Sequence, residues 1–158
     1  MKHLFQKSDK TESFWSAFKA SRDIPDTMQY DVVAFGDSPE LAKELSELVL
    51  HDRKRATTCL YRDIVDGSEN VPVIGGYVVL VDGFGTPKAI WRTIELRLGP
   101  MDSVTEEFAF MEGEGDRSRE EWLEMHRRYF SRQANLQGWQ MHDRIELVFE
   151  VFEIVFPL

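Results

Sequence analysis

A lysine and a threonine three residues apart have the types and spacing that best fit nucleophilic chemistry. They stand in the stretch Asp52-Arg53-Lys54-Arg55-Ala56-Thr57-Thr58. A threonine hydroxyl becomes a nucleophile when a neighbouring base accepts its proton, and a lysine amine can be that base. Arg53 and Arg55 flank Lys54, and like charges close to an amine favour its neutral, basic form. The stretch therefore indicates a Lys54–Thr57 nucleophile pair.

The same stretch also fits a purely structural role. It follows a predicted helix, and a solvated run of basic residues suits the negative end of a helix. In a continuous strand, Lys54 and Thr57 would point to opposite faces. A turn at the junction of helix and strand would bring them together. On the residues alone, the structural role is favoured over the nucleophile pair.

Metal and cofactor sites are not predicted. The histidines lack a common ligand spacing, and Cys59 is the single cysteine. The loop Glu112-Gly113-Glu114-Gly115-Asp116 lacks the alternating Asp/Asn pattern of a calcium loop. The glycine pairs Gly75-Gly76 and Gly83-Phe84-Gly85 precede no predicted helix, so neither fits a phosphate-binding loop. We therefore expect no metal ion and no cofactor.

Length and charge restrict the class of protein. The chain has 158 residues, which fits one core, and a net charge of −9. Such acidity argues against a protein that coats long nucleic acids. A lone cysteine excludes an intramolecular disulfide and fits a reducing compartment. The sequence shows neither an apolar stretch long enough for a membrane span nor a signal-peptide core. We expect a cytoplasmic protein without a membrane partner.

The charge is distributed unevenly. Residues 106–124 carry eight acidic and two basic side chains, whereas residues 51–62 carry four basic and one acidic side chain. The two segments can face each other across a cleft, or each can form a solvated surface. Solvated surfaces are the commoner of the two arrangements.

Helix signals occur in three places. Phe14, Trp15 and Phe18 predict a short N-terminal helix, ended by Pro25, that docks on the body or on a second subunit of a homodimer. Ser38 caps a helix that runs to about Leu50. Ser118 and Glu121 form a predicted capping box, followed by a buried helix face with Trp122, Met125, Tyr129 and Phe130.

Strand signals fill most of the remaining chain. They predict strands at Ala56–Tyr61, Tyr77–Asp82, Lys88–Leu98 and Arg144–Phe156, and a hairpin turn at residues 82–85. Four or five strands linked mostly by hairpins, with helices that do not alternate regularly with them, indicate the α+β class. We expect a small β-barrel or a strongly curved, mostly antiparallel sheet with helices packed around it.

Several of these motifs together resemble the ASCH domain family, which has a PUA-like β-barrel. The resemblance covers roughly Asp31 to Phe156 and rests on the helix, Lys-x-x-Thr, Val71–Gly75, the Tyr77–Asp82 strand and, above all, the acidic loop from Glu112 to Ser118. The family's Gly-x-Lys-x-x-Thr pattern is met with Asp52 in place of glycine. The resemblance as a whole implies two parts of the chain: an N-terminal helical extension, residues 1–30, and an ASCH domain, residues 31–158.

The resemblance implies a hydrolase site. In small members of the family, a Thr–Lys–Glu arrangement hydrolyses amides of acylated cytidine, and other members are reported as ribonucleases. Carried over, Thr57 is the nucleophile, Lys54 the base and Glu114 the carboxylate, with Glu112 as the rival for that third role. The expected partner is a small nucleoside or a short single-stranded RNA.

The alternative function is a non-catalytic RNA-binding module. In it, basic side chains contact phosphates and an exposed aromatic ring stacks on a base. The candidate substrate-binding residues are Arg53, Arg55, Arg62, Arg92 and Glu112.

Overall fold

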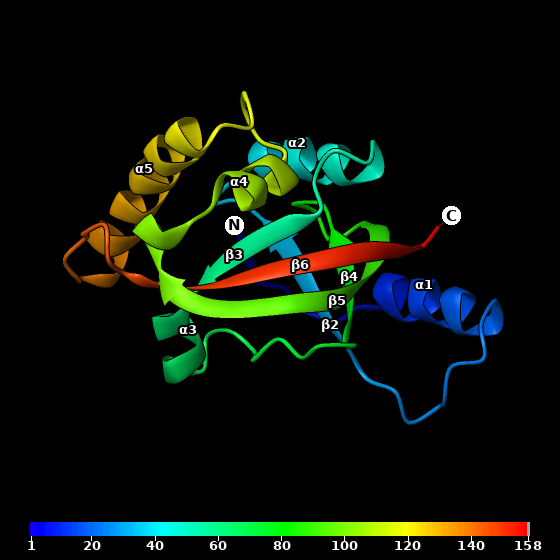
Figure 1. Cartoon of the computed structure of the whole chain (residues 1–158). Helices are drawn as coiled ribbons and strands as arrows, with labels where there is room; N and C mark the ends of the chain where they lie inside the picture. Colours follow the sequence, from blue (N-terminus) through cyan, green and yellow to red (C-terminus); the bar gives the residue numbers. More distant parts are fainter. Residues whose placement is uncertain (158) are drawn as a thin grey trace.

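The structure is a computed structural model that describes residues 1–157. Six strands form one curved sheet (Figure 1), and five α-helices and one 3₁₀ turn surround it. The strands are β1 (Lys2–Leu4), β2 (Tyr30–Phe35), β3 (Ala56–Leu60), β4 (Tyr77–Val81), β5 (Pro87–Pro100) and β6 (Glu146–Phe156). The helices are α1 (Asp9–Ala20), α2 (Pro39–Leu50), α3 (Tyr61–Asp66), α4 (Glu106–Glu112) and α5 (Arg119–Gln137), with the 3₁₀ turn at Met101–Ser103.

The sheet has the strand order β1-β2-β4-β5-β6-β3. Every neighbouring pair is antiparallel except β2 and β4, which are parallel. The two end strands, β1 and β3, lie close to each other, so the sheet curls into a half-barrel. The predicted α+β class and the strongly curved, mostly antiparallel sheet are confirmed.

The number of strands was underestimated, because β1 and β2 were not predicted. Val32 and Ala34 of β2 pack in the core cluster that contains α1, while Val33 and Phe35 pack in the cluster that contains α2. A strand covered on both faces has no alternation of polar and apolar residues. β1 is only three residues long and gives almost no periodic signal. The helices α3 and α4 were not predicted either, because helices of six and seven residues also give little periodic signal.

The predicted N-terminal helix is α1, and its aromatic residues are buried. Trp15 and Phe18 are 3% and 1% exposed, and the Trp15 ring stacks on Tyr30 with 4.7 Å between centroids. Phe14 is half-buried against the ring of Phe156. Their partners all belong to the same chain, so this cluster is part of the core of one molecule.

Two of the predicted helix starts can be compared with the structure. The Ser38 hydroxyl accepts the N–H of Leu41 at 3.2 Å, as predicted for the start of α2. At α5, Ser118 accepts the N–H of Glu121, but the Glu121 carboxylate accepts the N–H of Asp116 at 2.5 Å instead of that of Ser118. The predicted capping box is therefore only half formed, because Glu121 binds the preceding loop.

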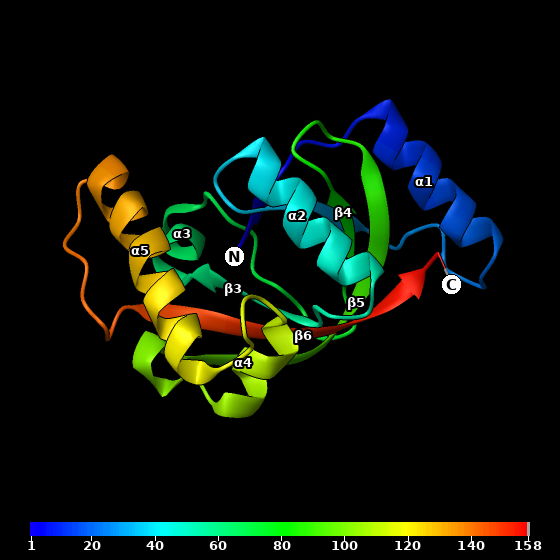
Figure 2. The same ribbon diagram turned by 90° about the horizontal axis from the view of Figure 1, so that it is seen from above.

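The helices cover the sheet unequally. Figure 1 shows α2, α4 and α5 on the same side of β3 and β6, with α1 beside the far end of the sheet. Seen from above in Figure 2, the beginning of the chain lies among α2, α3 and α5. None of the helices in residues 1–157 combines the length and the apolar character needed to cross a bilayer. The side chains of interest lie where α2, α4 and α5 converge.

Candidate functional site

The turn after α2 places Lys54. The backbone N–H groups of Arg53 and Lys54 both donate to the carbonyl of Leu48, at 2.9 and 3.0 Å. This tight turn needs a left-handed residue, and Asp52 takes that conformation with φ +59°. A non-glycine residue costs about 1 kcal/mol there, and aspartate is among the more tolerant types. The turn is therefore formed even though glycine is absent.

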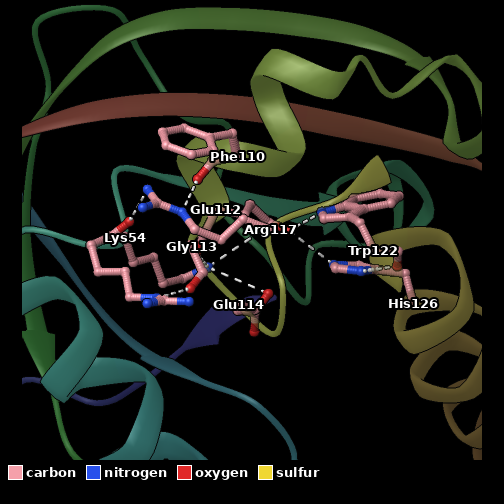
Figure 3. A network of polar contacts seen from close by, with 9 residues as sticks. Lys54, Phe110, Glu112, Gly113, Glu114, Arg117, Trp122 and His126 are labelled. Carbon is pink, nitrogen blue, oxygen red and sulfur yellow. Dashed lines mark hydrogen bonds and ion pairs between the residues drawn. The ribbon is translucent and has the colours of Figure 1, made fainter. Parts of the chain in front are cut away.

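Lys54 is buried completely and forms the centre of a polar network (Figure 3). Its Nζ lies 3.5 Å from Glu112 Oε1 and 3.7 Å from Glu114 Oε2, and it donates to the carbonyl of Glu112 at 3.4 Å. A buried ammonium is tolerated only when it is paired and hydrogen-bonded. The two carboxylates supply that pairing, so the network holds Lys54 in place.

The acidic loop lies directly against the basic turn. The Arg53 side chain donates to the carbonyls of Gly113 and Gly115 at 2.8 and 2.9 Å. Gly113 has φ +74°, and a Cβ there would lie 2.2 Å from the carbonyl oxygen of Arg53, so only glycine fits. Of the two arrangements open to the charged segments, the structure shows that they face each other.

Glu112 is held by three side chains and has no access to solvent. Its Oε2 accepts the indole N–H of Trp122 and lies 3.2 Å from His126 Nε2, while Lys54 contacts Oε1. Burial alone raises the pKa of the Glu112 carboxyl, but the charges of Lys54 and His126 outweigh burial and hold the pKa well below its usual range. Glu112 is therefore an ionised anchor for Lys54.

Glu114 has a different environment. Its side chain is 14% exposed and lines a cavity of about 200 Å³. His126, Tyr129, Arg128 and Arg132 of α5 line the same cavity. Of the two rival glutamates, Glu114 is the one that a molecule in this cavity can reach.

Thr57 lies on β3, opposite Glu150 of β6. It is fully buried, and within residues 1–157 its Oγ1 has no hydrogen-bond partner. The Lys54 amine and the Thr57 hydroxyl are therefore not hydrogen-bonded to each other. Thr58 is also fully buried with a hydroxyl that lacks a partner, but it points to the other face of the sheet.

The other predicted binding residues have separate contacts. Arg55 donates to the carbonyls of Val49 and Lys54 and pairs with Asp52. Arg62 lies over the ring of Trp139 and lines a cavity that contains none of the carboxylates above. Arg92 is exposed on β5, where its backbone lies opposite that of Tyr77 in the neighbouring strand β4. The structure therefore gathers Arg53, Lys54, Glu112 and Glu114, but not Arg62 or Arg92.

Several residues of the site were not found from the sequence as site residues. His126 and Trp122 bind Glu112, and Arg128 and Arg132 line the cavity of Glu114. Trp122 and His126 are four residues apart on one predicted helix, a spacing that places two side chains on the same face. In the structure their rings stack with 3.7 Å between centroids. Nothing in the spacing alone connects that helix to the acidic loop.

A metal ion is a possible occupant by residue type, because Glu112, Glu114 and His126 each have a ligand atom within 4.8 Å of the others. However, the Lys54 ammonium already contacts both carboxylates, and His126 and Trp122 contact Glu112. A cation would have to replace these partners. The donor set therefore fits an ion-pair network better than a metal centre.

The sequence profile of the ASCH domain family matches residues 31–156 of this chain. The chain belongs to the ASCH domain family. ASCH domains have a PUA-like fold that is generally associated with RNA binding. No match to this chain is found among curated proteins.

Two crystal structures resemble this ASCH protein along most of its length. The ASCH domain from Lactobacillus crispatus JV V101 is 27% identical, with a TM-score of 0.85 over 96% of this chain and 98% of that one. A protein from Enterococcus faecalis V583 is 32% identical, with a TM-score of 0.78 over 92% of this chain and 88% of that one. The expected family and its fold are confirmed.

Replacing Arg53 tests its contacts with the acidic loop. Arg53→Met keeps most of the aliphatic stem but removes both hydrogen bonds to the loop carbonyls, so the free energy of unfolding should fall by about 1 kcal/mol in urea denaturation. Arg92→Met is the matched control, because Arg92 contacts no part of the loop, and it should change stability by less than about 0.5 kcal/mol. Equal effects of the two substitutions would contradict the positioning role of Arg53 in this ASCH domain.

Proposed function

We propose that this protein binds a ribonucleoside or the end of a short RNA in the cavity beside Glu114 and hydrolyses an amide or phosphodiester bond there. The observation that carries the proposal is the buried Lys54 ammonium, paired with Glu112 on one side and with the cavity-lining Glu114 on the other. Buried ionisable groups beside a cavity are typical of catalytic sites.

The two glutamates have different tasks in this proposal. Glu112 stays ionised and holds Lys54, whereas Glu114 accepts a proton from the Lys54 ammonium when substrate displaces solvent. The neutral amine of Lys54 then takes the proton of the Thr57 hydroxyl as its oxygen attacks the substrate carbon or phosphorus. Protonated Glu114 returns its proton to the leaving group. A water molecule then releases the bound half of the substrate from Thr57.

The free hydroxyl of Thr57 is compatible with this role. A buried hydroxyl without a partner is costly, and such groups in native proteins usually have a functional reason. Hydrogen bonds between catalytic groups are often long before substrate binds and shorten in the complex. Thr57 and Lys54 are fully buried and do not line the cavity. The proposal therefore requires that substrate binding opens a path to the Thr57 hydroxyl and brings it within reach of the Lys54 amine.

A small substrate is favoured over a long RNA. The cavity of about 200 Å³ holds a fragment the size of one base or one acyl group, and the net charge of −9 repels a long polyanion. Arg53 and Arg55, two of the residues considered for phosphate contacts, already donate to backbone carbonyls. These contacts favour the hydrolase over the non-catalytic RNA-binding module.

The test is turnover on a panel of N-acylated nucleosides and short single-stranded RNAs, followed by chromatography. The native protein should release the free nucleoside or cleaved RNA from at least one of them, and Lys54→Met protein should not. Arg92→Met is the matched control, because Arg92 lies outside the cavity, and it should keep native turnover. Binding of RNA without any product would favour the binding module instead.

If short RNA binds, the salt dependence should be shallow. If the end of a short RNA enters the cavity, we expect about two to four phosphates of the adjoining nucleotides to contact basic side chains outside it. A plot of the logarithm of the binding constant against the logarithm of the salt concentration should then have a slope of about −1.4 to −2.8. Fluorescence anisotropy with a labelled single-stranded RNA, in a salt series, measures this slope. A slope that corresponds to eight or more contacts would contradict binding in a small cavity.

A further inference from the structure

A second and larger cavity adjoins the site. Its volume is about 480 Å³, and it lies among β1, the start of α2, α3 and α5, around the beginning of the chain seen in Figure 2. Gly36 and Tyr129 line both this cavity and the smaller one of Glu114. The acidic residues that line the larger cavity have no role in the proposed hydrolysis.

Two buried carboxylates without a counter-ion line this cavity. Glu69 is 7% exposed, and its Oε1 accepts the N–H of Leu4 at 2.6 Å. Asp63 is 9% exposed, and its Oδ1 is buried with no hydrogen-bond partner in the described part of the chain. Burial raises the pKa of both carboxyl groups, that of Glu69 to about 7. Neither carboxylate forms a salt bridge within residues 1–157.

The basic side chains around the cavity are already engaged. The Lys2 ammonium lies 2.5 Å from Glu150 Oε2, in the interior of the half-barrel. Arg132 of α5 pairs with Asp37, at 2.8 Å between Nε and Oδ2. His3 also lines the cavity, and burial lowers the pKa of its imidazole, which favours the neutral ring. Lys2 and Arg62 act on Glu69 and Asp63 only from a distance, so within residues 1–157 neither carboxylate has a direct ion-pair partner.

We propose that this cavity binds a small organic cation with several N–H donors, such as a primary amine, guanidinium or amidinium group. Such a group supplies a direct counter-charge to both carboxylates and a hydrogen bond to Asp63 Oδ1, which has no partner within residues 1–157. The cavity is large enough for an organic molecule, and Tyr129 and Leu136 offer carbon surface for its apolar part. This inference does not depend on the proposed hydrolysis.

Agmatine, which carries a guanidinium and an amine, is a suitable probe. Titration of ¹⁵N-labelled protein with agmatine at pH 8 should give saturable NMR shifts of amides that line the cavity, Leu4, Ser68 and Glu69 among them. Butyrate and butanol at the same concentrations should leave these amides unchanged. Shifts confined to amides elsewhere, or no saturation below about 10 mM agmatine, would overturn the proposal.

Variants locate the binding site. Glu69→Gln keeps an oxygen to accept the N–H of Leu4, so the fold should remain, and agmatine affinity should fall about tenfold. Asp63→Asn should have a similar effect. Asp66→Asn is the matched control, because Asp66 is an exposed acid on the same helix as Asp63 and does not line this cavity. Equal losses in Asp66→Asn and Asp63→Asn would show a general charge effect and would overturn the site.

Discussion

Thr57→Val protein is expected to keep its fold and to lose at least about a thousandfold of its turnover. Valine has nearly the shape of threonine but lacks the oxygen that would attack the substrate. The Thr57 hydroxyl has no hydrogen-bond partner in residues 1–157, so its removal leaves no other buried group unpaired. Stability should therefore stay equal or rise by about 1 kcal/mol, and the loss of activity cannot be attributed to unfolding.

Thr58→Val is the matched control for this change. Thr58 is equally buried, its hydroxyl also lacks a partner, and it lies next to Thr57 on β3 but faces the opposite side of the sheet. Its substitution should leave turnover within about twofold of the native value. Wild-type turnover of pure Thr57→Val protein, on any substrate that the native protein accepts, would reject nucleophilic catalysis at Thr57.

Lys54→Met should reduce turnover about as much as Thr57→Val. A base and the nucleophile that it activates act as one unit, so the double variant should be little worse than either single variant. Multiplied losses in the double variant would mean that the two side chains contribute independently. The stability of Lys54→Met should be measured as well, because it leaves Glu112 and Glu114 without the ammonium that pairs them.

Substitution of the two glutamates should separate stability from activity. Glu112→Gln removes the fully buried negative charge opposite Lys54 and should lower the free energy of unfolding by about 3–5 kcal/mol. Glu114→Gln affects a side chain that is 14% exposed and leaves the ion pair of Lys54 with Glu112 in place, so it should cost less stability than Glu112→Gln. Its turnover should nevertheless fall by about 10²–10⁴ if Glu114 exchanges a proton. If Glu114→Gln lost more stability and Glu112→Gln lost more turnover, Glu114 would be the structural anchor and Glu112 the proton carrier.

The stability effect of Glu112 has a defined pH dependence. The folded protein holds the pKa of this carboxyl below its ordinary value of 4.5, because Lys54 and His126 outweigh burial. A lowered pKa stabilises the fold fully above 4.5, and this contribution is lost as the pH falls through the folded value. The difference in stability between native and Glu112→Gln protein should therefore be constant near pH 7 and shrink below about pH 4.5. Urea denaturation at pH 7 and pH 3 measures both values.

The residues of the site could be named from the sequence more easily than its geometry. Lys54 was singled out by its spacing from Thr57, and Glu114 by the resemblance to the ASCH family; the structure brings their charged groups to 3.7 Å. His126 was not, although it touches Glu112. The connection between α5 and the acidic loop depends on a hydrogen bond from Trp122 and on packing across the core, which leave no local periodic signal.

Local patterns determined the α+β class, the helices α1, α2 and α5, the long strands β5 and β6, and the family, because caps, turns and periodic burial act over a few residues. The tertiary structure alone decided that β1 and β2 join the sheet and that Glu112 is enclosed while Glu114 reaches a cavity. It also decided that the Thr57 hydroxyl has no hydrogen-bond partner among the described residues. Burial and ion pairing depend on which distant segments meet, here the turn after α2, the end of α4 and one face of α5, and no spacing within a single segment encodes that meeting.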